Sequence, residues 1–127
     1  MKITLFTSNK NRHNYLINLL SEVCDQLFVV QECGTIMTVP DNYYASPNMK
    51  EYFENVINAQ YQLFGNSYIN EKNRNIKSFP MLYGDLNKCS LNSMEDFLNS
   101  DVYIVFGSSY IKGDLVDFLL KKKAINI

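Results

Sequence analysis

The chain has 127 residues, of which 46% are hydrophobic and 20% are charged, a composition that fits one globular domain and does not favour disorder. With 12 Lys and Arg against 13 Asp and Glu, the net charge of −1 at pH 7 argues against the broad basic face that nucleic-acid binding needs. No apolar window approaches the roughly eighteen residues of a membrane span, so no membrane partner is expected.

The first half of the chain predicts a strand, a helix, a second strand and a long helix. The apolar runs 3–6 and 27–30 predict strands buried on both faces, and the polar stretch 7–12 predicts a loop. Helical spacing predicts a helix over about 12–24, whose inward face comprises Tyr15, Leu16, Leu19, Leu20 and Val23. Ser46 as N-cap, Pro47 at the first position and Gly65 as the stop predict a second helix.

The second half predicts shorter elements. Residues 66–77 are polar and rich in Asn, which indicates a loop, and 79–82 fit a short edge strand because Pro80 is tolerated there. Ser93 followed by Asp96 resembles a capping box and predicts a short helix. The remaining segments predict a strand at 102–106, a helix at 111–122 that buries Leu115, Phe118 and Leu119, and a last strand at 125–127.

This order of elements predicts an α/β fold, a Rossmann-like and mostly parallel sheet with helices on both faces. We interpret residues 1–127 as a single domain, because neither a linker nor an internal repeat is visible. The sheet is expected to be truncated at its last strand, so the domain is expected to be incomplete.

In open parallel sheets ligands bind beyond the carboxyl ends of the strands, so the first polar loop holds candidate residues. Ser8, Asn9, Lys10 and Arg12 are candidates for contacts with a phosphate or a sugar hydroxyl, and a solvated loop is the alternative. The loop has no glycine and matches no nucleotide-binding motif. His13 is interpreted as a surface residue that deprotonates easily, because positive charge is unfavourable at a helix N-terminus.

The last two predicted strands carry the other candidates. Gly107, Ser108 and Ser109 follow a strand, where small residues allow a flat ligand to approach the backbone; a turn chosen for its geometry explains them equally well. Asn126 lies within the last apolar strand and is expected to be a buried amide, which is either structural or a donor to an oxyanion.

The cysteines bear on the compartment and on metal binding. The chain has three cysteines, Cys24, Cys33 and Cys89. Because their number is odd and they are widely spaced, we predict reduced thiols in a cytoplasmic protein. With a single histidine and no ligand quartet, no metal site is expected.

Three segments share a likeness to one family. Residues 106–113 read Phe-Gly-Ser-Ser-Tyr-Ile-Lys-Gly and are followed by Leu115, Phe118-Leu119 and the strand Ala124-Ile125-Asn126-Ile127. Residues 2–9 read Lys-Ile-Thr-Leu-Phe-Thr-Ser-Asn, and residues 82–87 read Leu-Tyr-Gly-Asp-Leu-Asn. Together these segments resemble the formyltransferase family, which includes glycinamide ribonucleotide, methionyl-tRNA and nucleotide-sugar formyltransferases.

The resemblance implies a reaction and a role for each matching residue. An acceptor amine attacks the formyl carbon of 10-formyltetrahydrofolate, the tetrahedral intermediate collapses, and tetrahydrofolate leaves without help from a metal. Asn126 matches the amide that polarises the formyl group, and residues 7–12 match the acceptor-side loop. The segment that holds the pterin ring corresponds to Gly107, Ser108, Ser109, Tyr110 and Ile111. The family's catalytic His would be the residue after Ile127, and a catalytic Asp follows later.

The resemblance therefore implies the N-terminal part of a formyltransferase that acts on a small amine such as an amino-sugar nucleotide, and we expect the 127 residues alone to be inactive. The loop at 7–12 lacks the glycines with which glycinamide ribonucleotide formyltransferase binds the phosphate of its acceptor. Of the family's acceptors, glycinamide ribonucleotide therefore fits this chain least well. Two alternatives stay open. One is a non-catalytic Rossmann-like module that binds a nucleotide or folate. The other is an interaction protein whose unfinished sheet forms a homo-oligomer.

Overall fold

A computed structural model describes residues 1–34, 44–70 and 72–127. They form one five-stranded sheet in which every pair of neighbouring strands is parallel, with the order β3-β2-β1-β4-β5. The strands are β1 (Lys2–Ser8), β2 (Gln26–Cys33), β3 (Ile76–Leu82), β4 (Val102–Val105) and β5 (Ile125–Asn126). This arrangement confirms the predicted α/β, Rossmann-like fold.

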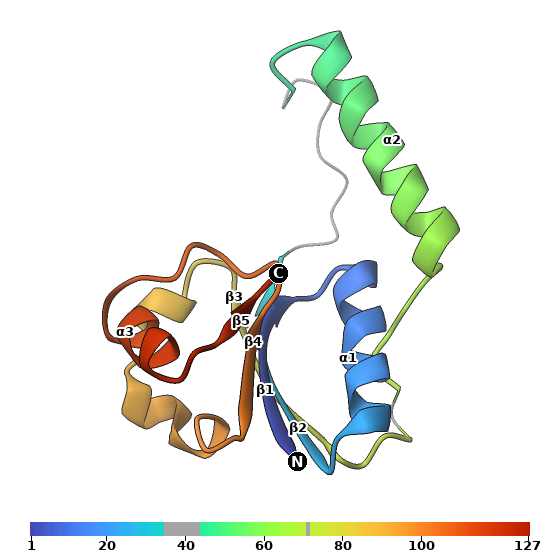
Figure 1. Ribbon diagram of the computed structural model, residues 1–127. Helices are drawn as coiled ribbons and strands as arrows, with labels where there is room; N and C mark the ends of the chain where they lie inside the picture. Colours follow the sequence, from blue (N-terminus) through green and yellow to red (C-terminus); the bar gives the residue numbers. More distant parts are fainter. Residues whose placement is uncertain (35–43, 71) are drawn as a thin grey trace.

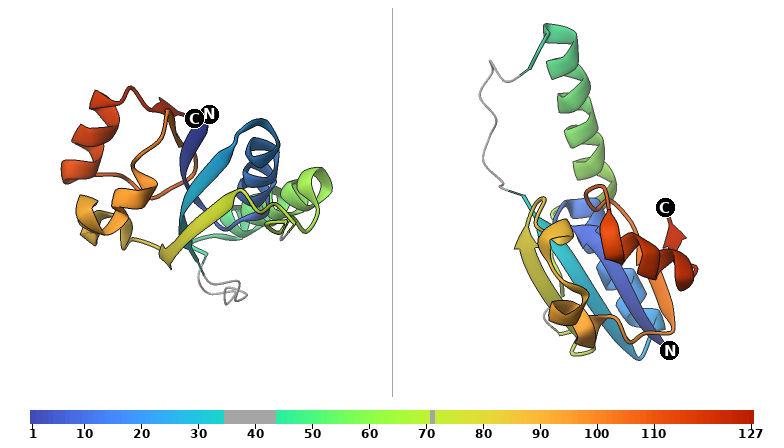
Figure 2. Two further views of the ribbon diagram at one scale, coloured as in Figure 1. Left: turned by 90° about the horizontal axis from the view of Figure 1, so that it is seen from below. Right: turned by 90° about the vertical axis from the view of Figure 1, so that its left-hand side faces the viewer.

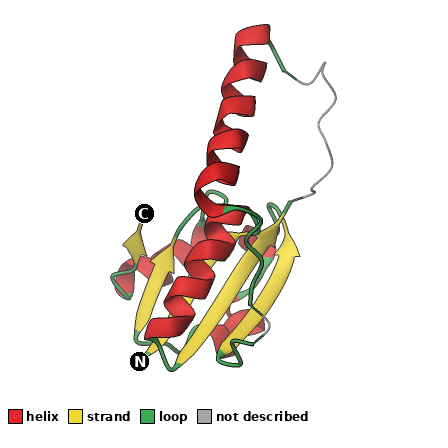
Figure 3. Ribbon diagram, turned by 90° about the vertical axis from the view of Figure 1, so that its right-hand side faces the viewer, coloured by secondary structure: helices red, strands yellow, loops and turns green. Residues whose placement is uncertain are grey.

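Helices cover both faces of the sheet, as predicted (Figure 1). Helix α1 (Asn11–Val23) lies across one face, as Figure 3 shows. The other face carries α3 (Gly113–Lys121) together with the short 3-10 helices η2 (Leu86–Lys88) and η3 (Leu91–Phe97), and the two layers are also separated in the views of Figure 2. Helix α2 (Pro47–Phe64) extends away from the sheet, and none of its residues is buried.

The core consists of two apolar clusters, one on each face of the sheet. Side chains alternate along a strand, so Phe6 of β1 packs towards Leu115 and Leu119 of α3, whereas Leu5 packs towards Ile17 of α1. Both faces of the inner strands are thus covered, which explains why their sequences read as continuous apolar runs.

The inward face of helix α1 is only partly the predicted one. Leu16 and Leu20 pack against the core as predicted. Tyr15, Leu19 and Val23 are exposed, and the most deeply buried residues are His13, Asn14, Ile17 and Ser21. Polar side chains are tolerated here because each finds a partner. The amide of Asn14 donates to the carbonyl of Ser67 at 2.9 Å and accepts from Gln31 Nε2 at 3.0 Å.

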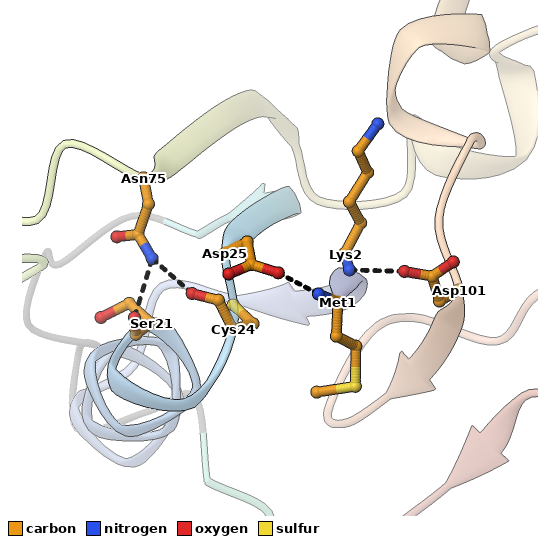
Figure 4. A network of polar contacts seen from close by, with 7 residues as sticks. All are labelled: Met1, Lys2, Ser21, Cys24, Asp25, Asn75 and Asp101. Carbon is orange, nitrogen blue, oxygen red and sulfur yellow. Dashed lines mark hydrogen bonds and ion pairs between the residues drawn. The ribbon is translucent and has the colours of Figure 1, made fainter.

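The Asn-rich segment before β3 is more than a loop, because its side chains bind the C-terminal end of α1. Asn75 Nδ2 donates to the carbonyls of Ser21 at 2.8 Å and Cys24 at 2.9 Å (Figure 4). At the same end of the sheet the ammonium group of Met1 contacts the carboxylate of Asp25. Strand β3 starts at Ile76, earlier than predicted, and it is an edge strand as expected.

Two helix starts were predicted from capping residues, and one of them is corrected. Ser46 caps α2 as predicted, with its Oγ accepting from the N–H of Met49 at 3.2 Å. Helix η3 is capped by Ser90, whose Oγ accepts from the N–H of Ser93 at 3.3 Å, so the cap lies three residues before the predicted one.

Two further findings concern cysteines and membranes. Cys24, Cys33 and Cys89 are free thiols. Among the helices in the described ranges, none combines the length and the apolar character needed to cross a membrane.

Candidate functional site

The two predicted binding loops lie side by side at the carboxyl edge of the sheet. They follow β1 and β4, which are neighbours paired in register from Ile3 opposite Val102 to Phe6 opposite Val105. Two hydrogen bonds continue this pairing past the strand end. The N–H of Phe106 donates to the carbonyl of Phe6 at 2.9 Å, and Thr7 Oγ1 donates to the carbonyl of Phe106 at 2.7 Å.

His13 lies between the two loops and is only 1% exposed, so its interpretation as a surface residue is wrong. Its Nδ1 is hydrogen-bonded to Ser8 Oγ, and its Nε2 is 3.1 Å from Arg12 Nε. The ring meets Phe106 edge-on, with centroids 5.0 Å apart and planes at 85°. Because the guanidinium N–H only donates, Nε2 must accept, and we assign the imidazole proton to Nδ1, which donates to Ser8.

The imidazole is held in its neutral form. The pKa of His13 is lowered from 6.5 to about 4, mainly by burial and also by the positive charges of Arg12 and Lys10. The expectation that His13 deprotonates easily is confirmed in direction, but burial and not the helix terminus is the leading cause.

Gly107 is required by this packing. A Cβ atom at position 107 would lie 2.2 Å from Nε2 of His13, and the backbone has a φ of +70°, which favours glycine. The sequence left a ligand contact and turn geometry as equal explanations. The structure supplies a third, a close approach between the imidazole ring and the backbone of the loop after β4.

Glu32, at the end of β2, was missed by the sequence reasoning. Its carboxylate is fully buried and accepts three hydrogen bonds. Oε1 accepts from the N–H of Gly84 at 3.2 Å and from Ser109 Oγ at 2.7 Å, and Oε2 accepts from the N–H of Ser109 at 2.6 Å. A charged residue two positions after the apolar run 27–30, and still within β2, was the available signal.

The loop after β4 is held at its far end by another missed residue, Asn87 of η2. Asn87 Nδ2 donates to the carbonyl of Tyr110 at 2.6 Å, and Oδ1 accepts from the N–H of Lys112 at 2.7 Å. The Tyr110 side chain is 81% exposed, with Lys112 Nζ 5.8 Å from its ring centroid. Ser108 and Ser109 before it and Ile111 after it are half-buried.

The four candidates in the first loop differ in what they offer a ligand. Asn9 is occupied, because its Nδ2 donates to the carbonyl of Gly34 and its Oδ1 accepts from the N–H of Gly34, both at 3.1 Å. Ser8 is nearly buried and turned to His13, and Arg12 is half-buried. Lys10 is exposed at the N-cap of α1, where its side chain makes no capping bond.

Comparison of the chain with protein families, characterised proteins and solved structures gives no match.

Asn126 is exposed on β5, so the expectation of a buried amide is wrong. Strand β5 is the outermost strand on this side and pairs Asn126 with Val105, and the N–H of Ile127 donates to the carbonyl of Val105 at 3.0 Å. Position 126 is thus level with the last residue of β4, two residues before Gly107. In the described ranges, no three His, Cys, Asp or Glu side chains gather where they could hold a metal ion.

Proposed function

We propose that this chain is the N-terminal part of a formyltransferase that moves a formyl group from 10-formyltetrahydrofolate to an amine on a small acceptor, such as an amino-sugar nucleotide. The observation that carries the proposal is the meeting of three segments at one edge of the sheet. The loops after β1 and β4 lie side by side there, and Asn126 of β5 is paired with the end of β4. The resemblance described above assigns the acceptor, the folate and the oxyanion to these three segments.

The exposed groups agree with this division. The loop after β4 offers small residues and the exposed ring of Tyr110, which suit a flat heteroaromatic ligand. The loop after β1 offers Lys10 and Arg12, whose positive charges favour an acceptor that carries phosphate. The exposed amide of Asn126 is free of the core and available to donate to an oxyanion as the formyl carbon becomes tetrahedral.

In the proposed reaction the acceptor nitrogen forms a bond to the formyl carbon, and the bond from that carbon to the folate nitrogen breaks. The acceptor nitrogen loses one proton and the departing nitrogen gains one, so a general acid and base are needed. His13 does not fit that role, because it is enclosed and its ring nitrogens are bonded to Ser8 and Arg12. We therefore propose that the 127 residues by themselves bind ligands without turnover.

The test is acceptor-dependent release of tetrahydrofolate by the full product of the gene, assayed with a panel of amino-sugar nucleotides. Release that requires both substrates supports the proposal. The absence of release with every acceptor, from a protein that is folded by circular dichroism, would count decisively against it.

A non-catalytic module is the second candidate, and the enclosed His13 favours it. The chain has one histidine, and that side chain is 1% exposed. A module would bind a nucleotide or a folate at the same edge and release no tetrahydrofolate. Titration calorimetry with 5-formyltetrahydrofolate and with a nucleoside diphosphate, run beside the transfer assay, separates the two functions.

A further inference from the structure

We propose that Glu32 is a positioning residue, which together with Asn87 holds the loop 107–112 in its folate-binding form before any ligand arrives. This inference rests on the proposed function, because it takes the loop as the folate site. Glu32 lies outside the segments that carry the resemblance, and Asn87, the last residue of the segment 82–87, has no role assigned to it by the resemblance.

A buried carboxylate is costly, so its partners indicate why it is tolerated. Glu32 belongs to β2, whereas Ser109 follows β4, and β1 lies between these two strands in the sheet. The carboxylate thus reaches past the end of β1 to accept both the N–H and the hydroxyl of Ser109. In the part of the chain that the structure describes, the partners of the Glu32 carboxylate are the hydrogen-bond donors of Ser109 and Gly84.

The third hydrogen bond of Glu32 fixes the turn after β3 in the same way. Gly84 donates its N–H to Oε1, so one carboxylate joins the ends of β3 and β4 to the end of β2. Gly84 lies three residues before Asn87, and Leu86 between them is 1% exposed and packed in the core. The turn that carries Asn87 is therefore anchored both by the core and by Glu32.

Asn87 holds the other end of the loop. Its side-chain amide accepts from the N–H of Lys112 and donates to the carbonyl of Tyr110. The amide thus takes the place of a peptide group of a neighbouring strand, which would also offer one acceptor and one donor. With Ser109 fixed at one side and Lys112 at the other, the ring of Tyr110 is left outside the fold at 81% exposure. A loop fixed in this way does not have to become ordered when a flat ligand stacks on the ring of Tyr110. The affinity for that ligand is then not reduced by a population of molecules in which the loop is open.

The experiment compares Glu32→Gln with the wild-type chain by two measurements. Amide hydrogen exchange at Ser109 reports loop order without any ligand, and titration calorimetry reports the affinity for 5-formyltetrahydrofolate. We expect exchange at Ser109 to be at least about tenfold faster in this variant. We expect its affinity for 5-formyltetrahydrofolate to be about tenfold weaker, because the apparent affinity falls tenfold when only about one tenth of the molecules have the binding form of the loop. Asp117→Asn, which removes an exposed carboxylate from α3, should change neither.

Asn87→Ala keeps the test decisive if Glu32→Gln does not fold, because Asn87 is exposed and its loss leaves the core intact. In that variant exchange at Lys112 should accelerate and affinity should fall, whereas Asn87→Asp, which retains the acceptor for Lys112, should recover part of the protection there.

The outcomes separate this inference from the proposed function. Unchanged exchange at Ser109 in Glu32→Gln, or faster exchange with unchanged folate affinity, would overturn the positioning role. A wild-type chain that shows no affinity for 5-formyltetrahydrofolate would overturn the assignment of the loop to folate and this inference with it, even if exchange shows the loop to be fixed by Glu32.

Discussion

Replacing Gly107 by alanine tests whether His13 sets the geometry at the edge of the sheet. The added Cβ would lie 2.2 Å from Nε2 and 2.7 Å from Cε1 of the ring, so the ring or the loop would have to move. Such overpacking costs about 1–3 kcal/mol. The positive φ adds about 1–2 kcal/mol for a residue with a side chain. We therefore expect Gly107→Ala to lower the free energy of unfolding by about 2–5 kcal/mol.

Two companion variants separate these costs. Gly113 has a comparable φ of +63° but no heavy atom within 4 Å of an added Cβ, so Gly113→Ala should show only the backbone cost of about 1–2 kcal/mol. In a His13→Ala background the ring is absent, and Gly107→Ala should again show only that cost. The double-mutant cycle between positions 13 and 107 should then give a coupling of about 1–3 kcal/mol.

Urea unfolding followed by circular dichroism measures all of these free energies, provided that the slope with denaturant stays constant across the variants. Additive effects at positions 13 and 107, to within about 0.5 kcal/mol, would show that the ring does not limit the space at position 107, because sites that do not touch behave additively. A cost of Gly107→Ala no larger than that of Gly113→Ala would show the same.

Three further predictions address the imidazole, the amide of β5 and the helix end. Because the pKa of His13 is 6.5 in the unfolded chain and about 4 in the fold, the unfolded state binds the proton first, and stability should fall by up to about 3 kcal/mol between pH 6.5 and 4. This loss of stability between pH 6.5 and 4 should be missing in His13→Gln. Identical profiles of stability against pH for the variant and the wild type would contradict the prediction. Asn126→Ala should change the free energy of unfolding by less than about 0.5 kcal/mol, because the side chain is exposed. The same change should slow formyl transfer by the full gene product about 100- to 1000-fold, and undiminished transfer excludes the oxyanion role. Asn75→Ala should cost about 1–3 kcal/mol in urea unfolding, because the carbonyls of Ser21 in α1 and of Cys24 at its C-cap lose their donor. A cost no larger than that of Asn58→Ala, at an exposed position, would disprove this.

The parts of the fold that were predicted correctly are those in which hydrophobic burial dominates. The runs at 3–6, 27–30 and 102–106 became the inner strands because both faces of the sheet are covered, and the caps Ser46 and Gly65 marked the ends of α2. Apolar periodicity succeeded only in part on α1, where Leu16 and Leu20 pack against the core but His13, Asn14 and Ser21 are buried beside Ile17. The buried amide of Asn14 is satisfied by Gln31 and Ser67, which are distant in the sequence, and periodicity does not register such partners.

The candidate site was only partly predictable for the same reason. The two loops could be found because each follows an apolar strand, and they meet because β1 and β4 are neighbours. The residues that fix these loops are His13, Glu32 and Asn87, each from a different element, and their contacts depend on tertiary placement. Asn126 was expected in the core because its neighbours are apolar, but β5 is an outer strand and leaves it exposed.

The central position of β1 has a consequence for the order in which this protein acquires structure. Its pairing with β2 joins segments that are close in the sequence, whereas its pairing with β4 brings together residues roughly a hundred positions apart, such as Ile3 and Val102. During synthesis β1, α1, β2 and β3 can assemble before β4 has been made. The edge where His13 meets Gly107 exists only after β4 has docked, so a folding intermediate with most of the sheet formed would still lack the candidate site.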